Sequence, residues 1–259
     1  MNQFPKGYQA CGFHCGIKKA KDDLTVVVSD VPAAAAAVYT NNLFQAAPLV
    51  VTKAHLAQEG KAQAIVVNSG VANAAMCKQG IHDAEAVAKA LADTFAIPEQ
   101  YTIVASTGVI GMPLPVDKIG AGIAKAKDAL LPLAESSEAA SRGIMTTDTV
   151  PKTASATITI AGAEVHFWGM CKGAGMIHPN MSTMLGFVLS DAAIESPLLA
   201  QALSDAIGDS FNMISVDGDT STNDMVTVLA NGCAENAPIT DAKSEEYQRF
   251  AAALKEVCV

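Results

Sequence analysis

A glycine-rich loop that carries a lysine runs directly into a Ser-Thr pair within residues 172–187. The letters read K-G-A-G-M-I-H-P-N-M-S-T-M-L-G-F, and an apolar run over 184–189 follows Ser182 and Thr183 at once. A threonine hydroxyl is a weak nucleophile unless a base lies beside it. If the chain is cut before Thr183, the new α-amino group, with a pKa of about 7.7–8.0, can serve as that base.

The same stretch also fits a purely structural interpretation. Thr183 would then be an ordinary strand residue, and Lys172 would be a solvated loop charge. Ser-Thr before an apolar run is common, so the stretch taken alone favours the structural interpretation. The nucleophile hypothesis therefore depends on other motifs.

Four further motifs place small or hydroxyl-bearing residues in turn-like settings. A-S-T-G-V-I-G at 105–111 ends a strand-like run in a small-residue turn, where backbone N–H groups can point into a cleft. I-M-T-T-D-T at 144–149 is rich in hydroxyls, and S-V-D-G-D-T-S-T-N-D at 215–224 is both acidic and hydroxyl-rich. The fourth motif is V-N-S-G-V-A-N-A at 67–74.

In this order the motifs resemble those of the bifunctional ornithine acetyltransferase / amino-acid acetyltransferase family of arginine biosynthesis. The resemblance runs from about residue 7 to the last residue. It implies an acyltransferase that cleaves its own precursor between Ser182 and Thr183 and then carries the acetyl group on Thr183. It also implies an oxyanion pair at Thr107 and Gly108. Substrate contacts are implied for Thr146, Lys172 and Thr183.

The resemblance implies substrates, partners and a fold as well. The donor would be N-acetylornithine and the acceptor glutamate, with acetyl-CoA as an alternative donor and no cofactor. Residues 1–182 would form an alpha chain and 183–259 the first portion of a beta chain, assembled as a heterotetramer. The implied architecture is an α/β layered fold of the αββα type, which self-cleaving aminopeptidases share.

Two features depart from the family pattern. Ser182 stands where alanine is usual before the cut, and because both residues are small we expect cleavage to survive. Family members also continue to a substrate-binding glutamate and to carboxy-terminal Asn and Thr/Ser residues, which this sequence does not contain. The 259-residue chain is therefore expected to cleave itself poorly or not at all and to transfer acetyl groups slowly.

Two other functions stay open on the sequence. The chain could be an inactive or ligand-binding homologue, because it does not contain those carboxy-terminal residues. It could also be a self-cleaving aminopeptidase of the same fold. The nucleophile of those enzymes is serine, so Thr183 and the T-G-V-I-G turn favour acetyl transfer.

Composition narrows the function classes. A chain that is 50% hydrophobic can bury a substantial core. A net charge of −9 without a basic stripe argues against nucleic-acid binding. No apolar run reaches the roughly 18–20 residues of a membrane span, and the amino terminus lacks a signal-peptide core. We therefore expect a cytoplasmic protein that binds neither nucleic acid nor membrane.

Cysteines suggest two further sites. Cys11, His14 and Cys15 lie close together, but a structural zinc site needs a second ligand pair, and none follows. No metal is therefore expected. Cys171 adjoins Lys172, and a nearby ammonium would lower the pKa of its thiol. Neighbouring side chains often point apart, which favours a structural role.

Strands and helices are expected to alternate. Short apolar runs predict buried strands at 24–29, 48–52, 64–68, 101–106 and 225–229, with another strand beginning at Thr183. Helical spacing predicts helices at 84–95, capped by Asp83, at 116–127, from the Ser-Pro pair at 196–197, and at 241–257. Residues 152–160 and 164–168 predict a hairpin.

Overall fold

The computed structural model of the chain describes residues 4–177 and 184–259. Its strands are β1 (Tyr8–Phe13), β2 (Leu24–Tyr39), β3 (Lys61–Val71), β4 (Thr102–Val109), β5 (Leu131–Pro132), β6 (Lys152–Ile160), β7 (Ala163–Lys172), β8 (Leu185–Ser190) and β9 (Met225–Ala230). Its α-helices are α1 (Ala47–Glu59), α2 (Cys77–Phe95), α3 (Val116–Ala129), α4 (Leu133–Gly143), α5 (Ser196–Gly208) and α6 (Glu245–Cys258). Two short 3₁₀ helices are η1 (Glu99–Tyr101) and η2 (Phe211–Met213).

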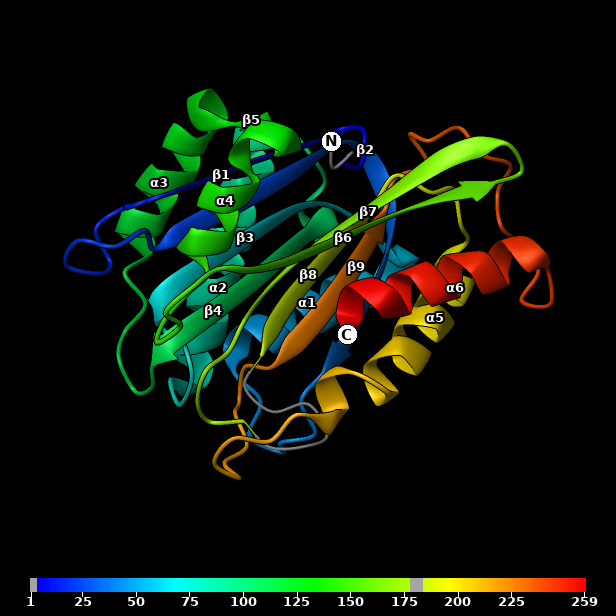
Figure 1. The fold of residues 1–259 in the computed structure, drawn as a ribbon. Helices are drawn as coiled ribbons and strands as arrows, with labels where there is room; N and C mark the ends of the chain where they lie inside the picture. Colours follow the sequence, from blue (N-terminus) through cyan, green and yellow to red (C-terminus); the bar gives the residue numbers. More distant parts are fainter. Residues whose placement is uncertain (1–3, 178–183) are drawn as a thin grey trace.

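Within these described ranges the strands form one mixed sheet of nine strands. Its order is β4-β3-β2-β9-β8-β7-β6, with β1 paired to β2 and β5 paired to β1 (Figure 1). The first part of β2 pairs with β1 and its last part pairs with β9, so this one strand connects the two halves of the sheet. The register with β3 shifts between Val28 and Ala33. Because an irregularity of this kind bends a strand, the two halves can turn relative to each other.

Two neighbouring pairs of strands are parallel. Strands β3 and β4 are joined through α2, and strands β8 and β9 are joined through α5. A parallel pair needs such a crossover, which places the carboxyl ends of both strands at the same edge of the sheet. The ends of β3 and β4 are where the candidate site forms.

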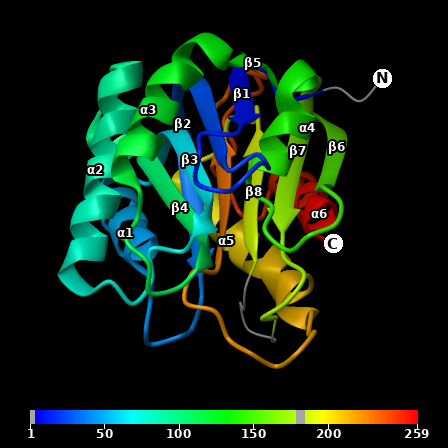
Figure 2. The same cartoon turned by 90° about the vertical axis from the view of Figure 1, so that its left-hand side faces the viewer.

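Helices cover both faces of the sheet. Figure 2 shows α1, α2 and α3 grouped over one half of it and α5 and α6 over the other. Alternate strand residues face opposite ways: Val188 packs in the core with α5 and α6, whereas Phe187 packs in the core that α4 covers. Val66 and Ile65 of β3 divide in the same way between the core of α1 to α3 and the core of α4.

Most of the predicted elements are confirmed. The α/β class is correct, and the runs at 24–29, 64–68, 101–106 and 225–229 fall in β2, β3, β4 and β9 within one residue. The predicted hairpin is β6 and β7, which pair along their whole length. The predicted helices correspond to α2, α3, α5 and α6. The strand predicted at Thr183 is β8, which begins at Leu185, and Thr183 itself lies outside the described residues.

Two details of the sequence prediction are wrong. Residues 48–52 lie inside α1, where Pro48 occupies the first turn. A short apolar run cannot distinguish a buried strand from a buried helix, and proline is favoured at a helix start. Asp83 does not cap α2, because that helix begins at Cys77. Asp83 instead accepts a hydrogen bond from Gln79, one turn earlier.

The helices were not expected to include a membrane span. In the part of the chain that the structure describes, none of them combines the length and the apolar character needed to cross a bilayer.

Candidate functional site

A cavity of about 470 Å³ lies where the carboxyl ends of β3 and β4 approach the end of β7. Thr107, Gly108, Thr146 and Lys172 all line it. These are the four implied site residues within the described part of the chain, and they come from three different motifs. The motifs at 67–74 and 215–224 also contribute lining residues, among them Gly70 and Asn223.

Two facing glycines shape the cavity wall. Gly108 of β4 lies opposite Gly70 of β3, and their φ angles are 132° and 122°. A Cβ on Gly108 would lie 2.3 Å from the carbonyl carbon of Gly70. The two backbones therefore approach so closely that only glycine fits at position 108.

Lys172 and Thr107 form a buried polar pair in this cavity. Lys172 Nζ donates a hydrogen bond to Thr107 Oγ1 at 2.9 Å, and the two residues are only 4% and 7% exposed. An ammonium group can only donate, so the Thr107 oxygen accepts, and its own O–H is left to donate into the cavity. Burial lowers the pKa of Lys172, while the nearby carboxylates of Asp148 and Asp224 raise it.

Asp148 connects the hydroxyl-rich loop to the end of β7. Its carboxylate accepts hydrogen bonds from Lys152 Nζ and from the Gly173 N–H at 2.8 Å. Burial would raise the pKa of Asp148, but the Lys152 ammonium and the Gly173 N–H outweigh it and hold that pKa below its usual range. Asp148 thus fixes Thr146, two residues earlier, relative to Lys172.

Asn223 is a site residue that the sequence did not single out by itself. Its Nδ2 donates to Ala72 O at 2.6 Å and to Ser106 O at 2.9 Å. These carbonyls follow β3 and lie within β4, so the side chain ties the loop before β9 to both strands. A longer-range contact of this kind leaves no signal in local sequence.

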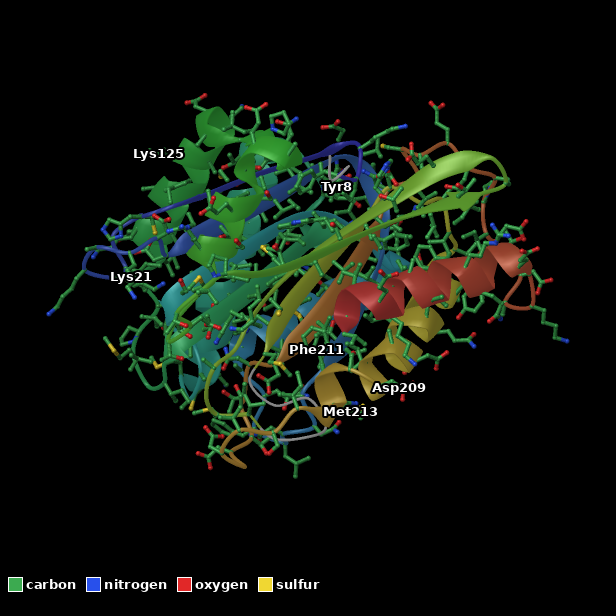
Figure 3. All side chains as sticks on the ribbon, viewed as in Figure 1. Tyr8, Lys21, Lys125, Asp209, Phe211 and Met213 are labelled. Atoms are coloured by element: carbon green, nitrogen blue, oxygen red, sulfur yellow. The ribbon has the colours of Figure 1, made fainter. Side chains whose placement is uncertain are left out.

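Lys18 is a second lining residue that the sequence did not single out. It belongs to the loop between β1 and β2, on which Figure 3 labels Lys21. The carboxylate of Asp23 accepts hydrogen bonds from the backbone N–H groups of Cys15, Ile17 and Lys18, at 2.6–2.8 Å. Asp23 is fully buried, so it holds this loop in a fixed conformation.

Replacing Asp23 with asparagine is expected to lower the free energy of unfolding by about 3 kcal/mol, because hydrogen bonds to a charged acceptor are strong and one donor would lose its partner. Burial opposes ionisation of Asp23, but the backbone N–H groups outweigh it and lower its pKa from 3.8. Its contribution is therefore complete above that value and is lost as pH falls through the lower, folded pKa. Urea unfolding at several pH values checks this. Asp22→Asn, one residue away, should change stability little. An equal loss of stability in both variants would show that the Asp23 carboxylate does not hold the loop.

The predicted nucleophile and cleavage site lie outside the described residues. Thr183 and Ser182 are among residues 178–183, and the chain is described again from Met184. Leu185, the first residue of β8, lies opposite Lys172 in the register of β7 and β8. The chain thus emerges from 178–183 beside a lysine that lines the cavity.

The candidate metal ligands and the candidate reactive thiol all lie within the described ranges. In these ranges no three His, Cys, Asp or Glu side chains are grouped to hold a metal ion. His14 instead lies 3.0 Å from the Asp23 carboxylate, and Cys11 is buried. Burial raises the pKa of the Cys171 thiol and outweighs the lowering by the Lys152 ammonium, so the lowered pKa considered for this thiol is not found.

A second cavity, of about 360 Å³, shares Lys172 with the first. Apolar side chains dominate it, among them Ile177, Phe211 and Val257. It does not contain Thr107, Gly108 or Thr146, so the larger cavity is the candidate site.

Comparison with known proteins gives a consistent result. The chain matches the ArgJ family over residues 9–259. It is 50% identical over 256 residues to the arginine biosynthesis bifunctional protein ArgJ of Bacillus cereus, with 98% of this chain and 62% of that protein covered. The chain therefore spans about 62% of the length of this curated relative.

Solved structures of similar proteins agree with this family match. A structure of arginine biosynthesis bifunctional protein ArgJ from Bacillus halodurans matches with a TM-score of 0.64 and 46% identity, over 69% of this chain and 92% of that one. Ornithine acetyltransferase from Mycobacterium tuberculosis, complexed with ornithine, matches with a TM-score of 0.60 and 33% identity, over 70% and 93%. A serine aminopeptidase of Ochrobactrum anthropi, described as a variant of the Ntn-hydrolase fold, shares the fold at 13% identity and a TM-score of 0.54, over 98% of this chain and 83% of that one. These matches confirm the predicted fold class.

Proposed function

The chain belongs to the ArgJ family, and on that premise we propose that it transfers an acetyl group from N-acetylornithine to glutamate in arginine biosynthesis. The observation that carries the proposal is the single cavity that Thr107, Gly108, Thr146 and Lys172 line together. The name of the Bacillus cereus relative, an arginine biosynthesis protein, supports the pathway. The ornithine bound to the Mycobacterium tuberculosis acetyltransferase supports the substrate class.

The nucleophile in this proposal is Thr183, released as an amino-terminal residue by cleavage after Ser182. Residues 1–182 and 183–259 are then separate chains of one heterotetrameric assembly. The chain lengths of the relatives support such a cleavage. The solved relatives are covered to 92% and 93% by matches over only 69% and 70% of this chain, so those crystallised chains are shorter than this one. The curated relative, in contrast, is longer.

The reaction proceeds in two halves. The Thr183 amine accepts the proton of its own hydroxyl, and the oxygen attacks the acetyl carbon of N-acetylornithine. The tetrahedral intermediate collapses, the Cα-bound nitrogen of ornithine takes the proton and leaves, and an acetyl-threonine ester remains. The amine of glutamate then attacks this ester, which gives N-acetylglutamate and regenerates the free hydroxyl.

Thr107 and Gly108 stabilise the negative charge that develops on the acetyl oxygen. The Thr107 O–H is oriented by the Lys172 ammonium at 2.9 Å, and the Gly108 backbone lies at the strand end where no side chain intervenes. One such donor contributes about 10²–10³ in rate. The Lys172 charge also disfavours protonation of the Thr183 amine through like-charge repulsion, which keeps that base in its active, neutral form.

Acetyl-CoA is an alternative donor for the same acetyl-threonine ester, with glutamate as acceptor. The Bacillus cereus relative is named a bifunctional protein, which supports a second activity. If the chain transfers acetyl groups from acetyl-CoA but not from N-acetylornithine, the proposal is restricted to this second donor.

Aminopeptidase activity and ligand binding without turnover are the competing functions. The fold is shared with a serine aminopeptidase at 13% identity, which indicates the fold alone. Family membership and a threonine at position 183 favour acetyl transfer. Incubating the protein with N-acetylornithine and glutamate, and separately with amino-acid amides, distinguishes the three: acetyl transfer, amide hydrolysis or neither.

Thr107→Ala is expected to lower kcat by about 100-fold or more while changing KM little, because its contact strengthens only as charge develops. Thr146→Ala is expected to show the opposite pattern, with a raised KM and a smaller loss of kcat. Steady-state kinetics with N-acetylornithine and glutamate measures both. Thr159→Ala, at an exposed residue of strand β6, is the matched control. A raised KM with unchanged kcat for Thr107→Ala would make Thr107 a ground-state binding residue.

A further inference from the structure

Lys18 lies far along the sequence from the motifs that supply the other site residues, yet it lines the same cavity. Its Nζ donates hydrogen bonds to Met145 O at 2.6 Å and to Asp22 O at 2.8 Å. Besides the site cavity it lines an adjoining cavity of about 640 Å³, and Thr146 and Thr147 also line both. Lys18 therefore lies where the two cavities adjoin.

The Lys18 ammonium retains capacity for a ligand. An ammonium has three N–H donors, and the two carbonyl oxygens named above are the acceptors that the described residues supply. A carboxylate accepts such charged N–H donors in short, strong hydrogen bonds. The position of Lys18 is fixed, because Asp23 holds its loop and the absence of a side chain at Gly70 leaves room for Ile17 and Lys18.

The charges around the cavity favour an anion. Lys18 and Lys172 line it together, and none of the described lining residues is acidic. Two nearby carboxylates are engaged elsewhere: Asp23 accepts backbone N–H groups of its own loop, and Asp148 accepts from Lys152 and Gly173. The carboxylates of Asp22 and Asp224 also lie near and raise the pKa of Lys18 and Lys172, respectively. Burial lowers the pKa of Lys18, and the Lys172 charge contributes to this lowering. A bound anion would offset the repulsion between these two ammonium groups.

We propose that Lys18 binds the α-carboxylate of the amino-acid substrates and thereby selects amino acids over the corresponding amines. This inference rests on the proposed function. N-acetylornithine and glutamate both pass through the same site, and the group they share beside the reacting nitrogen is the α-carboxylate. That carboxylate is attached to the carbon that carries the nitrogen, so it must lie near the oxyanion pair, in the cavity that Lys18 lines. The side-chain ammonium of ornithine would be repelled from the same place.

Binding to the native chain in the absence of an acetyl donor tests this. Isothermal titration calorimetry compares L-ornithine with 1,4-diaminobutane, and L-glutamate with 4-aminobutyrate, so that each pair differs only in the α-carboxylate. A charge-assisted hydrogen bond contributes about 1.5–3 kcal/mol, which corresponds to roughly 10–150-fold in Kd. Lys18→Met should weaken binding of both amino acids by that factor and leave binding of both amines unchanged.

Three comparisons make the outcome decisive. Lys19→Met removes the same charge from the exposed neighbouring residue and should weaken neither pair. Lys18→Arg, which keeps the charge, should restore most of the preference for the amino acids. Lys18→Gln replaces Lys18→Met if the latter does not fold. An equal effect of Lys18→Met on amino acids and amines, or no effect, overturns the role of Lys18 and leaves the proposed function intact. If the native chain binds neither ornithine nor glutamate, the proposed function fails, and the role of Lys18 with it.

Discussion

Thr183→Ala is expected to leave the chain in one piece and to abolish acetyl transfer, whereas the native chain on prolonged incubation is cut into two chains that stay together, the second beginning at Thr183. Cleavage requires the threonine hydroxyl, because its oxygen must attack the carbonyl carbon of Ser182 and convert the peptide bond to an ester that water then hydrolyses. In the proposed mechanism the same oxygen later carries the acetyl group. Removing it therefore eliminates both steps, and no neighbouring hydroxyl can replace a nucleophile whose base is its own amine. Intact mass and amino-terminal sequencing check the result.

Two variants at the cleavage site serve as controls. Thr183→Ser keeps a hydroxyl next to the new amine, so cleavage should be slowed but not abolished. Ser182→Ala introduces the residue that the family pattern has before the cut and should cleave at least as well as the native chain. A fragment that begins at another residue, or full transfer by an uncut chain, would show that Thr183 is not the nucleophile.

The fold could be predicted from sequence where one element decides its own structure. The apolar runs of β3, β4 and β9 are buried on both faces, so composition alone identifies them. The second part of β2 was not predicted, because Pro32 and a run of alanines have low β propensity. Its conformation is decided by pairing with β9, far away in the sequence. Helix α1 was predicted wrongly for a related reason, since its packing against β4 and not its pattern settles the structure.

The candidate site could be predicted only where a motif carries a residue. Thr107, Gly108, Thr146 and Lys172 were each named from a short motif, and the structure brings them into one cavity. Lys18 and Asn223 act through contacts that join segments 127 and 151 residues apart. Such contacts arise from the topology of the sheet, so no local spacing or residue type predicts them.

The close approach of β3 and β4 gives the second large expected effect. Gly108→Ala should lower the free energy of unfolding by on the order of 3 kcal/mol, because the new Cβ meets backbone and φ is unfavourable for a side chain. The obstructing atoms are the carbonyl carbon, carbonyl oxygen and Cα of Gly70, at 2.3–2.7 Å. They cannot swing away as a flexible side chain would. Since residue 70 is already glycine, no smaller residue there can relieve the clash, and the strand ends must separate.

Separation of the strand ends would displace Thr107 and Gly108, the proposed oxyanion donors, so kcat should also fall by about 100-fold or more. Gly111→Ala is the matched control, because Gly111 lies in the same turn with a φ of 76° but nothing lies within 4 Å of its Cβ position. That variant meets the backbone strain without the clash and should cost only about 1 kcal/mol, with little loss of kcat. Urea unfolding and steady-state kinetics on both variants separate the two causes. Equal losses would assign the role of Gly108 to its backbone angle, whereas a larger loss at Gly108 assigns it to the contact with Gly70.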